Sequence, residues 1–274
     1  MKSRILEFSN HILAEGQEFL ELAEKCFMVS DDIAINFRDY SQGGKEFDVS
    51  HIVLGYSYYR STESFLATIQ LVNSGFISDA QAVLRKLVEM AINMRYMCLD
   101  IAKYAPMYWY FLYLKSGKMM KRSQSVDVYP DEFKKSLKSL QADNLALEEM
   151  AKKYFEIDDK GGIKKQYYDS WPGIDTKEMA RRCGMSADYE YCYRLFSLST
   201  HASIEEITNY LDMETGIFGP KIERDTCYEV ILETIRYYVV VLDLCICHFG
   251  FKLHGSLQVI SNGIESLRNN PRLQ

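Results

Sequence analysis

An arginine and a histidine two helical turns apart are the residues of this sequence best suited to catalysis. Residues 189–203 read YEYCYRLFSLSTHAS, with Arg194 and His201 seven positions apart and Ser197 between them. In a helix these three side chains would share one face. An imidazole can move protons to and from phosphodiester oxygens near neutral pH, and a guanidinium can hold the phosphate with two parallel hydrogen bonds. The spacing therefore favours RNA cleavage without a metal, with the substrate 2′-hydroxyl as nucleophile.

A structural role for His201 is the alternative to catalysis, because a half-buried histidine can simply bond a backbone carbonyl. His201 and Glu205 are four apart and could share a metal ion, but two ligands are fewer than a typical site needs. The sequence has no glycine-rich phosphate loop, no G-x-S-x-G elbow and no H-E-x-x-H motif. We therefore expect no cofactor and no metal.

A second charged pair lies on an earlier apolar segment. Arg85 and Glu89 are four apart in AVLRKLVEMAINM, residues 82–94. One interpretation is a half-buried ion pair that fixes helix packing, since an arginine placed before a glutamate gains little along a single helix. The other is that both side chains reach the pocket of His201, where Glu89 orients the imidazole or accepts its proton. Both interpretations stay open.

The composition is that of an ordinary globular protein. The 274 residues are 47% hydrophobic, enough for one large domain or two modest ones. The formal charge of −6 argues against a general basic surface that coats nucleic acid, although it allows a local basic pocket. The seven cysteines are scattered and form no C-x-x-C pair. They are typical of free, mostly buried thiols in a reducing cytoplasm.

Apolar residues recur every three or four positions along nearly the whole chain, which is the period of an α-helix. No segment keeps the alternation of a β-strand, and residues 30–48 are less regular. Pairs that resemble capping boxes open three helices, at Ser78, Asp175 and Thr226. The expected helices cover about 3–28, 50–75, 78–94, 101–122, 130–157, 175–184, 187–203 and 226–250, and a last one follows Ser256.

These segments predict an all-α fold, a bundle of about eight to nine helices in a single domain over residues 1–274. Residues 160–174, KGGIKKQYYDSWPGI, form the clearest linker and mark where a sub-boundary would fall. The most apolar stretch, residues 237–251, is too short to span a membrane and carries Asp243 in its middle. The charged N-terminus lacks the apolar run of a signal peptide. We therefore expect no membrane contact and a cytoplasmic location.

Aromatic residues are numerous, with 20 tyrosines and two tryptophans, Trp109 and Trp171. Packing in the core or at a subunit interface is their ordinary role, because tyrosine buries much area while its hydroxyl finds a partner. Stacking of bases in an RNA-binding groove is the alternative.

The Arg194-x6-His201 spacing on a late helix of a helical bundle resembles the R-x4-6-H motif of HEPN domains. The resemblance implies a HEPN-like core with additional helices and a metal-independent endoribonuclease of a toxin–antitoxin or anti-phage system. It further implies RNA as the substrate, a homodimer whose two motifs form one site, and an antitoxin or defence-system partner protein. His201 would be the general acid or base and Arg194 the phosphate clamp, supported by Arg85, Glu89 and Ser197. The sequence departs from the usual motif at Leu195, where many HEPN nucleases carry a polar residue.

A longer stretch, residues 171–203, resembles a large family of uncharacterised bacterial helical proteins. The shared features are a Trp-x-Gly turn, a Tyr-x-x-x-Tyr spacing, a Leu-Ser-x-His ending and an earlier Arg-x-x-x-Glu pair. In this sequence they correspond to Trp171 with Gly173, Tyr189 with Tyr193, Leu198 with Ser199 and His201, and Arg85 with Glu89. This resemblance implies a fold and a site but no activity. The second function that we predict is therefore a non-catalytic helical module that binds a protein partner or a small ligand.

Overall fold

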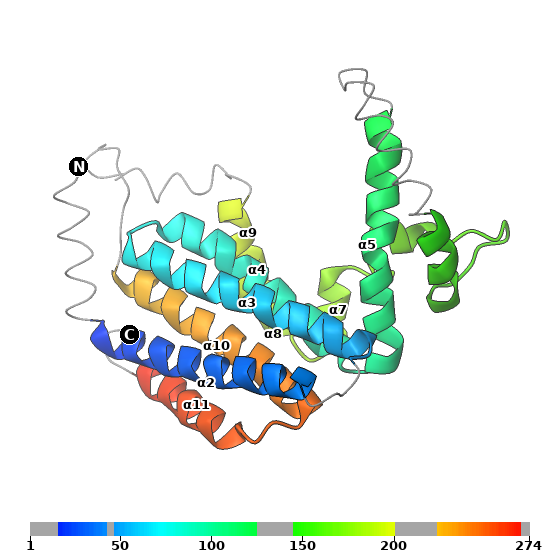
Figure 1. Cartoon of the computed structure of the whole chain (residues 1–274). Coiled ribbons are helices and arrows are strands. Elements are labelled where there is room, and N and C mark those ends of the chain that lie inside the picture. The colour runs from blue at the N-terminus through cyan, green and yellow to red at the C-terminus, as the bar shows by residue number, and fades with distance from the viewer. Residues whose placement is uncertain (1–15, 43–46, 125–144, 201–223, 270–274) are drawn as a thin grey trace, which may run out of the picture.

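The computed structural model describes residues 16–42, 47–124, 145–200 and 224–269 (Figure 1). Within these ranges the chain forms α-helices, short 3-10 and π turns, and one isolated bridge between Ile157 and Ile163. The predicted all-α bundle is confirmed. No helix of the described ranges has both the length and the apolar character needed to cross a membrane.

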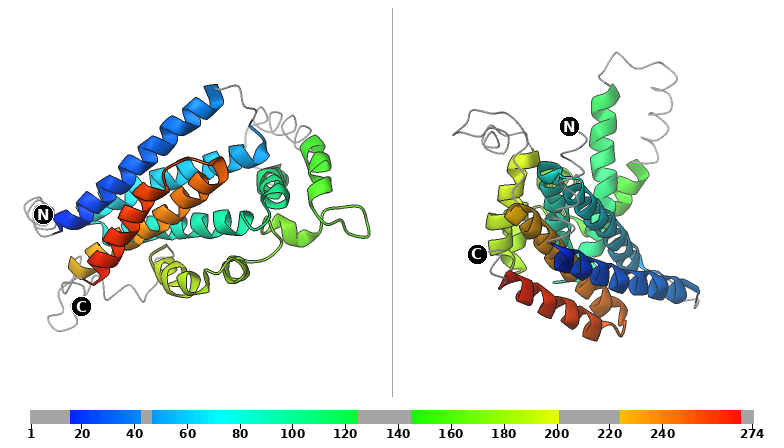
Figure 2. Two further views of the ribbon diagram at one scale, coloured as in Figure 1. Left: turned by 90° about the horizontal axis from the view of Figure 1, so that it is seen from below. Right: turned by 90° about the vertical axis from the view of Figure 1, so that its left-hand side faces the viewer.

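Five helices form the main bundle and lie along one another (Figures 1 and 2). They are α2 (Gln17–Gln42), α3 (Val49–Asn73), α4 (Ile77–Met97), α10 (Arg224–Phe249) and α11 (His254–Arg268). The helix α10 lies at the centre, packed against the other four, which explains why it is apolar on nearly every face. Its Tyr238 is fully buried, and the hydroxyl forms hydrogen bonds of 2.5 Å to Ser30 and 2.6 Å to Thr62.

A second group of elements is set against one side of this bundle. The helix α5 (Ile101–Gln124) begins beside α3 and rises away from the bundle, as Figure 1 shows. Residues 145–151 are helical and continue into a 3-10 turn, η1 (Lys152–Tyr154), and a second 3-10 turn, η2 (Lys165–Tyr168), packs on α5. The chain then returns along α4 as α7 (Thr176–Arg182), α8 (Ser186–Asp188), the π turn η3 (Tyr189–Tyr193) and α9 (Arg194–Thr200).

The residues expected to form a linker, 160–174, are packed rather than extended. Ile163, Tyr167 and Trp171 are each about 5% exposed or less. Burial of these apolar side chains ties the segment to α4 and α5, and it therefore helps to shape the site described below.

Several predicted helix ends are wrong because capping patterns compete with packing. The helix expected over 3–28 is described from Gln17 and continues to Gln42. The buried side chains of Ile33 and Phe37 extend its apolar face into residues 30–48, which the sequence pattern indicates to be less regular. The helix α4 begins at Ile77 without a side-chain cap, so Ser78 lies inside its first turn. Thr226 and Ser256 likewise lie inside α10 and α11.

The predicted start of α7 and the predicted C-terminal ends of α3, α7 and α10 are confirmed, whereas the predicted end of the 130–157 helix is wrong. Asp175 accepts a 2.8 Å hydrogen bond from the backbone N–H of Glu178 and caps α7. Gly75, Gly184 and Gly250 follow α3, α7 and α10 with positive φ, as expected of helix-ending glycines. The helix expected over 130–157 is described only from residue 145, and it ends in the 3-10 turn at Tyr154.

Candidate functional site

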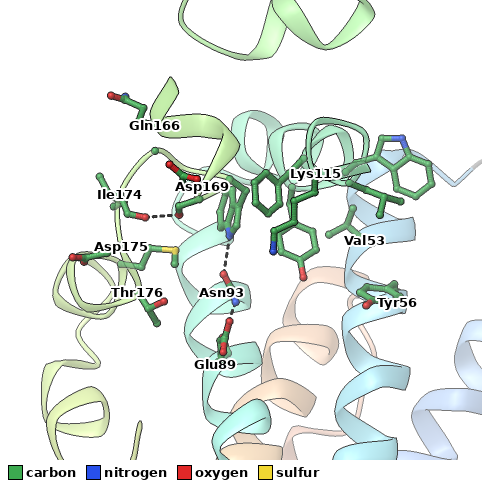
Figure 3. Close-up of a pocket in the computed structure, with 18 of the residues that line it drawn as sticks. Val53, Tyr56, Glu89, Asn93, Lys115, Gln166, Asp169, Ile174, Asp175 and Thr176 are labelled. Carbon is green, nitrogen blue, oxygen red and sulfur yellow. Dashed lines mark hydrogen bonds between the residues drawn. The ribbon is translucent and has the colours of Figure 1, made fainter. Parts of the chain in front are cut away.

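A large pocket lies where the 165–179 segment meets α3, α4 and α5 (Figure 3). Its volume is about 1100 Å³. Its wall is mainly aromatic and aliphatic. Polar groups enter it from α4, from α5 and from the segment, including Glu89, Asn93, Lys115 and Asp169. A pocket of this size, apolar with a few convergent polar groups, is the usual form of a small-molecule site.

Trp171 holds one wall of the pocket in place. Its indole Nε1 donates a 2.7 Å hydrogen bond to Oδ1 of Asn93, and the Asn93 amide donates a 2.9 Å hydrogen bond to the backbone carbonyl of Glu89 (Figure 3). Trp171 and Asn93 are both buried. The polar atoms of this wall are thus satisfied from α4 itself, which keeps the wall rigid without a ligand.

The turn after Trp171 requires glycine. Gly173 has φ +74°, and a Cβ at this position would lie 2.7 Å from Cε1 of Tyr167 and 3.0 Å from Nε2 of Gln166. Both the backbone conformation and the lack of space exclude a side chain. The Trp-x-Gly feature seen in the sequence is therefore the turn that closes the pocket.

Aromatic rings surround the indole of Trp171. The rings of Tyr96, Tyr104 and Tyr108 meet it edge to face, with centroid separations of 5.5–5.9 Å. Tyr108 also lines the pocket, and burial, with the nearby Tyr56 and Glu89, raises its pKa to about 12. The phenol is therefore neutral at physiological pH and offers a ring face and a hydroxyl rather than a charge.

The charge of the pocket is negative. Glu89, Asp169 and Asp175 line it against a single lysine, Lys115, whose Nζ lies 5.1 Å from the centroid of the Phe111 ring. The Asp175 carboxylate is occupied in capping α7. The half-buried Glu89 carboxylate has no hydrogen-bond or ion-pair partner among the described residues, and it also lines a smaller adjoining pocket of about 190 Å³. It is the group best placed to meet a ligand.

Two other predicted site residues, Arg85 and Ser197, contact each other between α4 and α9. Arg85 on α4 donates from Nε to Oγ of Ser197 at 2.8 Å and from Nη2 to the hydroxyl of Tyr193 at 2.7 Å. Its guanidinium carbon also lies 4.5 Å from the centroid of the Tyr193 ring. Burial and the charge of Glu89 raise the pKa of Tyr193, which the positive charge of Arg85 opposes. Arg85 and Ser197 thus join α4 to α9, and Glu89 lies about one helical turn after Arg85 on α4.

Arg194, unlike Arg85 and Ser197, points to solvent and does not join this cluster. Its side chain is 66% exposed, and Nη1 donates a 2.8 Å hydrogen bond to Glu190, which also pairs with Lys177 at 2.8 Å. Arg194 and Ser197 are three apart, so they differ in direction by roughly 60° around a regular helix. Ser197, rather than Arg194, therefore meets Arg85. His201 and Glu205 lie outside the described residues.

Sequence reasoning missed two residues of this site. Tyr193 was noted only for its spacing, although it stacks on Tyr189 and holds Arg85. No role was predicted for Asn93, although a polar residue inside the apolar run of α4 indicates a buried hydrogen bond. Trp171 was expected to pack or to stack on a base, and it packs.

A family model described as "Family of unknown function (DUF5677)" matches residues 51–218. The match covers more than half of the 274 residues, and the chain belongs to this family. No curated protein and no solved structure matches the chain. The matched range contains every residue that lines the large pocket, together with the Arg85 cluster.

Proposed function

We propose that this member of the DUF5677 family is a ligand-binding helical module whose large pocket takes a small organic cation with an aromatic or apolar body. The observation that carries the proposal is that Glu89 lines an aromatic pocket and that its carboxylate has no partner among the described residues. A half-buried carboxylate has lost part of its hydration, so a cation that reaches it gains a charge-assisted hydrogen bond.

The aromatic lining supports the same class of ligand. Tyr56, Tyr108 and Trp109 line the pocket together with Trp171, and ring faces attract cations that lie over them. The apolar part of the ligand would gain from burial against Ile52. An anionic ligand would have to approach three carboxylates against one lysine, which Coulomb repulsion disfavours.

Intrinsic fluorescence tests this proposal directly, because both tryptophans of the chain line the pocket. We expect 4-phenylbutylamine, phenethylamine and phenyltrimethylammonium to change the tryptophan emission with saturation. The matched anions 4-phenylbutyrate and phenylacetate should bind at least about tenfold more weakly, since one charge-assisted contact is worth about 1.5–3 kcal/mol. If no cation gives a saturating change, or if the anions bind as well, the proposal fails.

We propose RNA cleavage of the HEPN type as a second candidate, favoured by the contact between Arg85 and Ser197. This contact brings a guanidinium from α4 onto the helix that carries Arg194, and Nη1 of Arg85 makes no hydrogen bond to a described residue. The proposal includes a homodimer, an antitoxin or defence-system partner protein and a cytoplasmic location, which the seven free cysteines support.

The nuclease proposal predicts RNA cleavage that persists in EDTA and leaves 2′,3′-cyclic phosphate ends. His201→Ala and Arg194→Ala should abolish the cleavage in folded protein, while Lys177→Ala should retain it. Intact RNA after incubation with a high concentration of folded dimer would rule this candidate out and would leave the pocket proposal untouched.

A further inference from the structure

The junction between α10 and α11 brings together three side chains that commonly bind metal ions. Asp243 and Cys247 are four apart, so they share one face near the end of α10. The chain then turns at Gly250, which has φ +70°, and His254 opens α11. All three residues are exposed, and they lie outside both the large pocket and the Arg85 cluster.

The distances suit a single small ion. Oδ1 of Asp243 lies 3.7 Å from Nδ1 of His254 and 3.9 Å from Sγ of Cys247, and the three ligand atoms lie within 4.8 Å of one another. In a tetrahedral zinc site with bonds of about 2.0–2.3 Å, neighbouring ligand atoms are roughly 3.3–3.8 Å apart. Small side-chain rotations would therefore bring all three atoms onto one ion.

The donor set selects the kind of ion. One thiolate, one imidazole and one carboxylate are the ligands of zinc and of the similar ion Co²⁺, whereas Mg²⁺ and Ca²⁺ prefer oxygen alone. The exposed position leaves room for water as a fourth ligand. Cys247 must release its thiol proton to solvent when it binds, so the affinity should increase with pH.

We propose that Asp243, Cys247 and His254 form a binding site for one zinc ion that links the end of α10 to the start of α11. The α10–α11 turn holds one edge of the bundle together, because α11 packs on both α10 and α2. An ion bound only in the folded state stabilises that state by mass action. The site is independent of the proposed pocket, so either proposal can fail without the other.

Titration of the untagged full-length chain with Co²⁺ tests the site, because a Co²⁺–thiolate bond gives a near-ultraviolet charge-transfer band. We expect one ion per chain, loss of the band in Cys247→Ser, and at least about tenfold weaker binding in His254→Ala and Asp243→Asn. Cys98→Ser is the matched control and should keep the band, since Cys247 is the exposed cysteine and Cys98 is half-buried.

The melting temperature in the presence of Zn²⁺ is a second measurement, which distinguishes this site from adventitious metal binding. Zn²⁺ should raise the melting temperature of the wild type and of Cys98→Ser, and it should raise those of Cys247→Ser and His254→Ala clearly less. All variants alter exposed or half-buried side chains, and circular dichroism can verify that they fold. A band that survives in Cys247→Ser, more than one equivalent of Co²⁺ with equal affinity, or equal stabilisation of His254→Ala would overturn the proposal.

Discussion

Trp171 and Asn93, 78 positions apart in the chain, are joined by a 2.7 Å hydrogen bond inside the protein. The bond fastens the segment of residues 165–179 to α4, and both residues line the large pocket. A wall that is rigid before a ligand arrives favours ligand binding, because a preformed site loses less entropy on binding.

Asn93→Leu should lower the free energy of unfolding by about 1–3 kcal/mol, because it leaves the buried indole N–H of Trp171 without an acceptor. Urea unfolding followed by circular dichroism measures the change. The exposed Asn262→Leu on α11 serves as the control and should shift stability by less than about 0.5 kcal/mol. Equal effects of the two substitutions would show that the bond does not hold the wall.

Gly173→Ala should destabilise the fold more than Gly184→Ala. Both glycines have φ near +75°, so each alanine incurs roughly 1–2 kcal/mol of backbone strain. The added Cβ meets nothing within 4 Å at Gly184, but at Gly173 it meets the Tyr167 ring at 2.7 Å. Thermal unfolding of the two variants compares them, and a lower melting temperature for Gly184→Ala would contradict the described turn.

Arg85→Ala and Arg194→Ala should differ clearly in stability. Arg85 is half-buried and bonded to Tyr193 and Ser197, so its loss should cost about 2 kcal/mol. The ion pair of Arg194 with Glu190 is exposed and screened by solvent, so its loss should lower the free energy of unfolding much less. Chemical denaturation measures both. Similar small losses would mean that the Arg85 contacts do not help to dock α9 on α4.

Acid should destabilise the protein through His248. Burial lowers the pKa of this imidazole below its ordinary 6.5, and the nearby His51 lowers it further, while Asp48 opposes the shift. Below pH 6.5 the unfolded chain therefore binds the proton more readily than the folded chain. The free energy of unfolding decreases as the pH is lowered, until the pH is below the pKa of the folded state. The slope contributed by one proton is at most about 1.4 kcal/mol per pH unit.

The variant His248→Leu isolates this effect, because it removes the titrating group. Unfolding free energies measured at pH 7.5 and 5.5 should show a smaller decrease for His248→Leu than for the wild type. The exposed His254→Leu, measured in EDTA, should keep the wild-type decrease. An unchanged decrease in His248→Leu would assign the acid sensitivity to other groups.

Local patterns in the sequence were enough to predict most of the described helices. The three- and four-residue spacing of apolar side chains reports directly on burial of one helix face, and glycines with positive φ such as Gly184 mark helix ends by their own backbone preference. The start of α4 was less predictable. The sequence around Ser78 offers a capping box, but the helix begins earlier, at Ile77.

The site was only partly predictable, because its geometry depends on contacts between distant segments. The pairs Arg85 with Ser197 and Asn93 with Trp171 join α4 to segments far along the chain, and no local spacing encodes them. The ion pair of Arg194 with Glu190 was different, since the two residues are four apart on one helix. The spacing of Glu190 and Arg194 therefore predicts a solvent-exposed ion pair between them, which is an alternative to a phosphate-binding role for Arg194.

The affinity of 4-phenylbutylamine for the wild type and for Glu89→Gln, measured by tryptophan fluorescence, tests whether the Glu89 carboxylate recognises the ligand. Glutamine keeps the shape of the side chain and removes its charge. We expect Kd to rise at least about tenfold in Glu89→Gln. It should stay unchanged in Glu24→Gln, an exposed glutamate of α2 outside the pocket. Equal Kd values in the wild type and Glu89→Gln would contradict the claim that this carboxylate recognises the ligand.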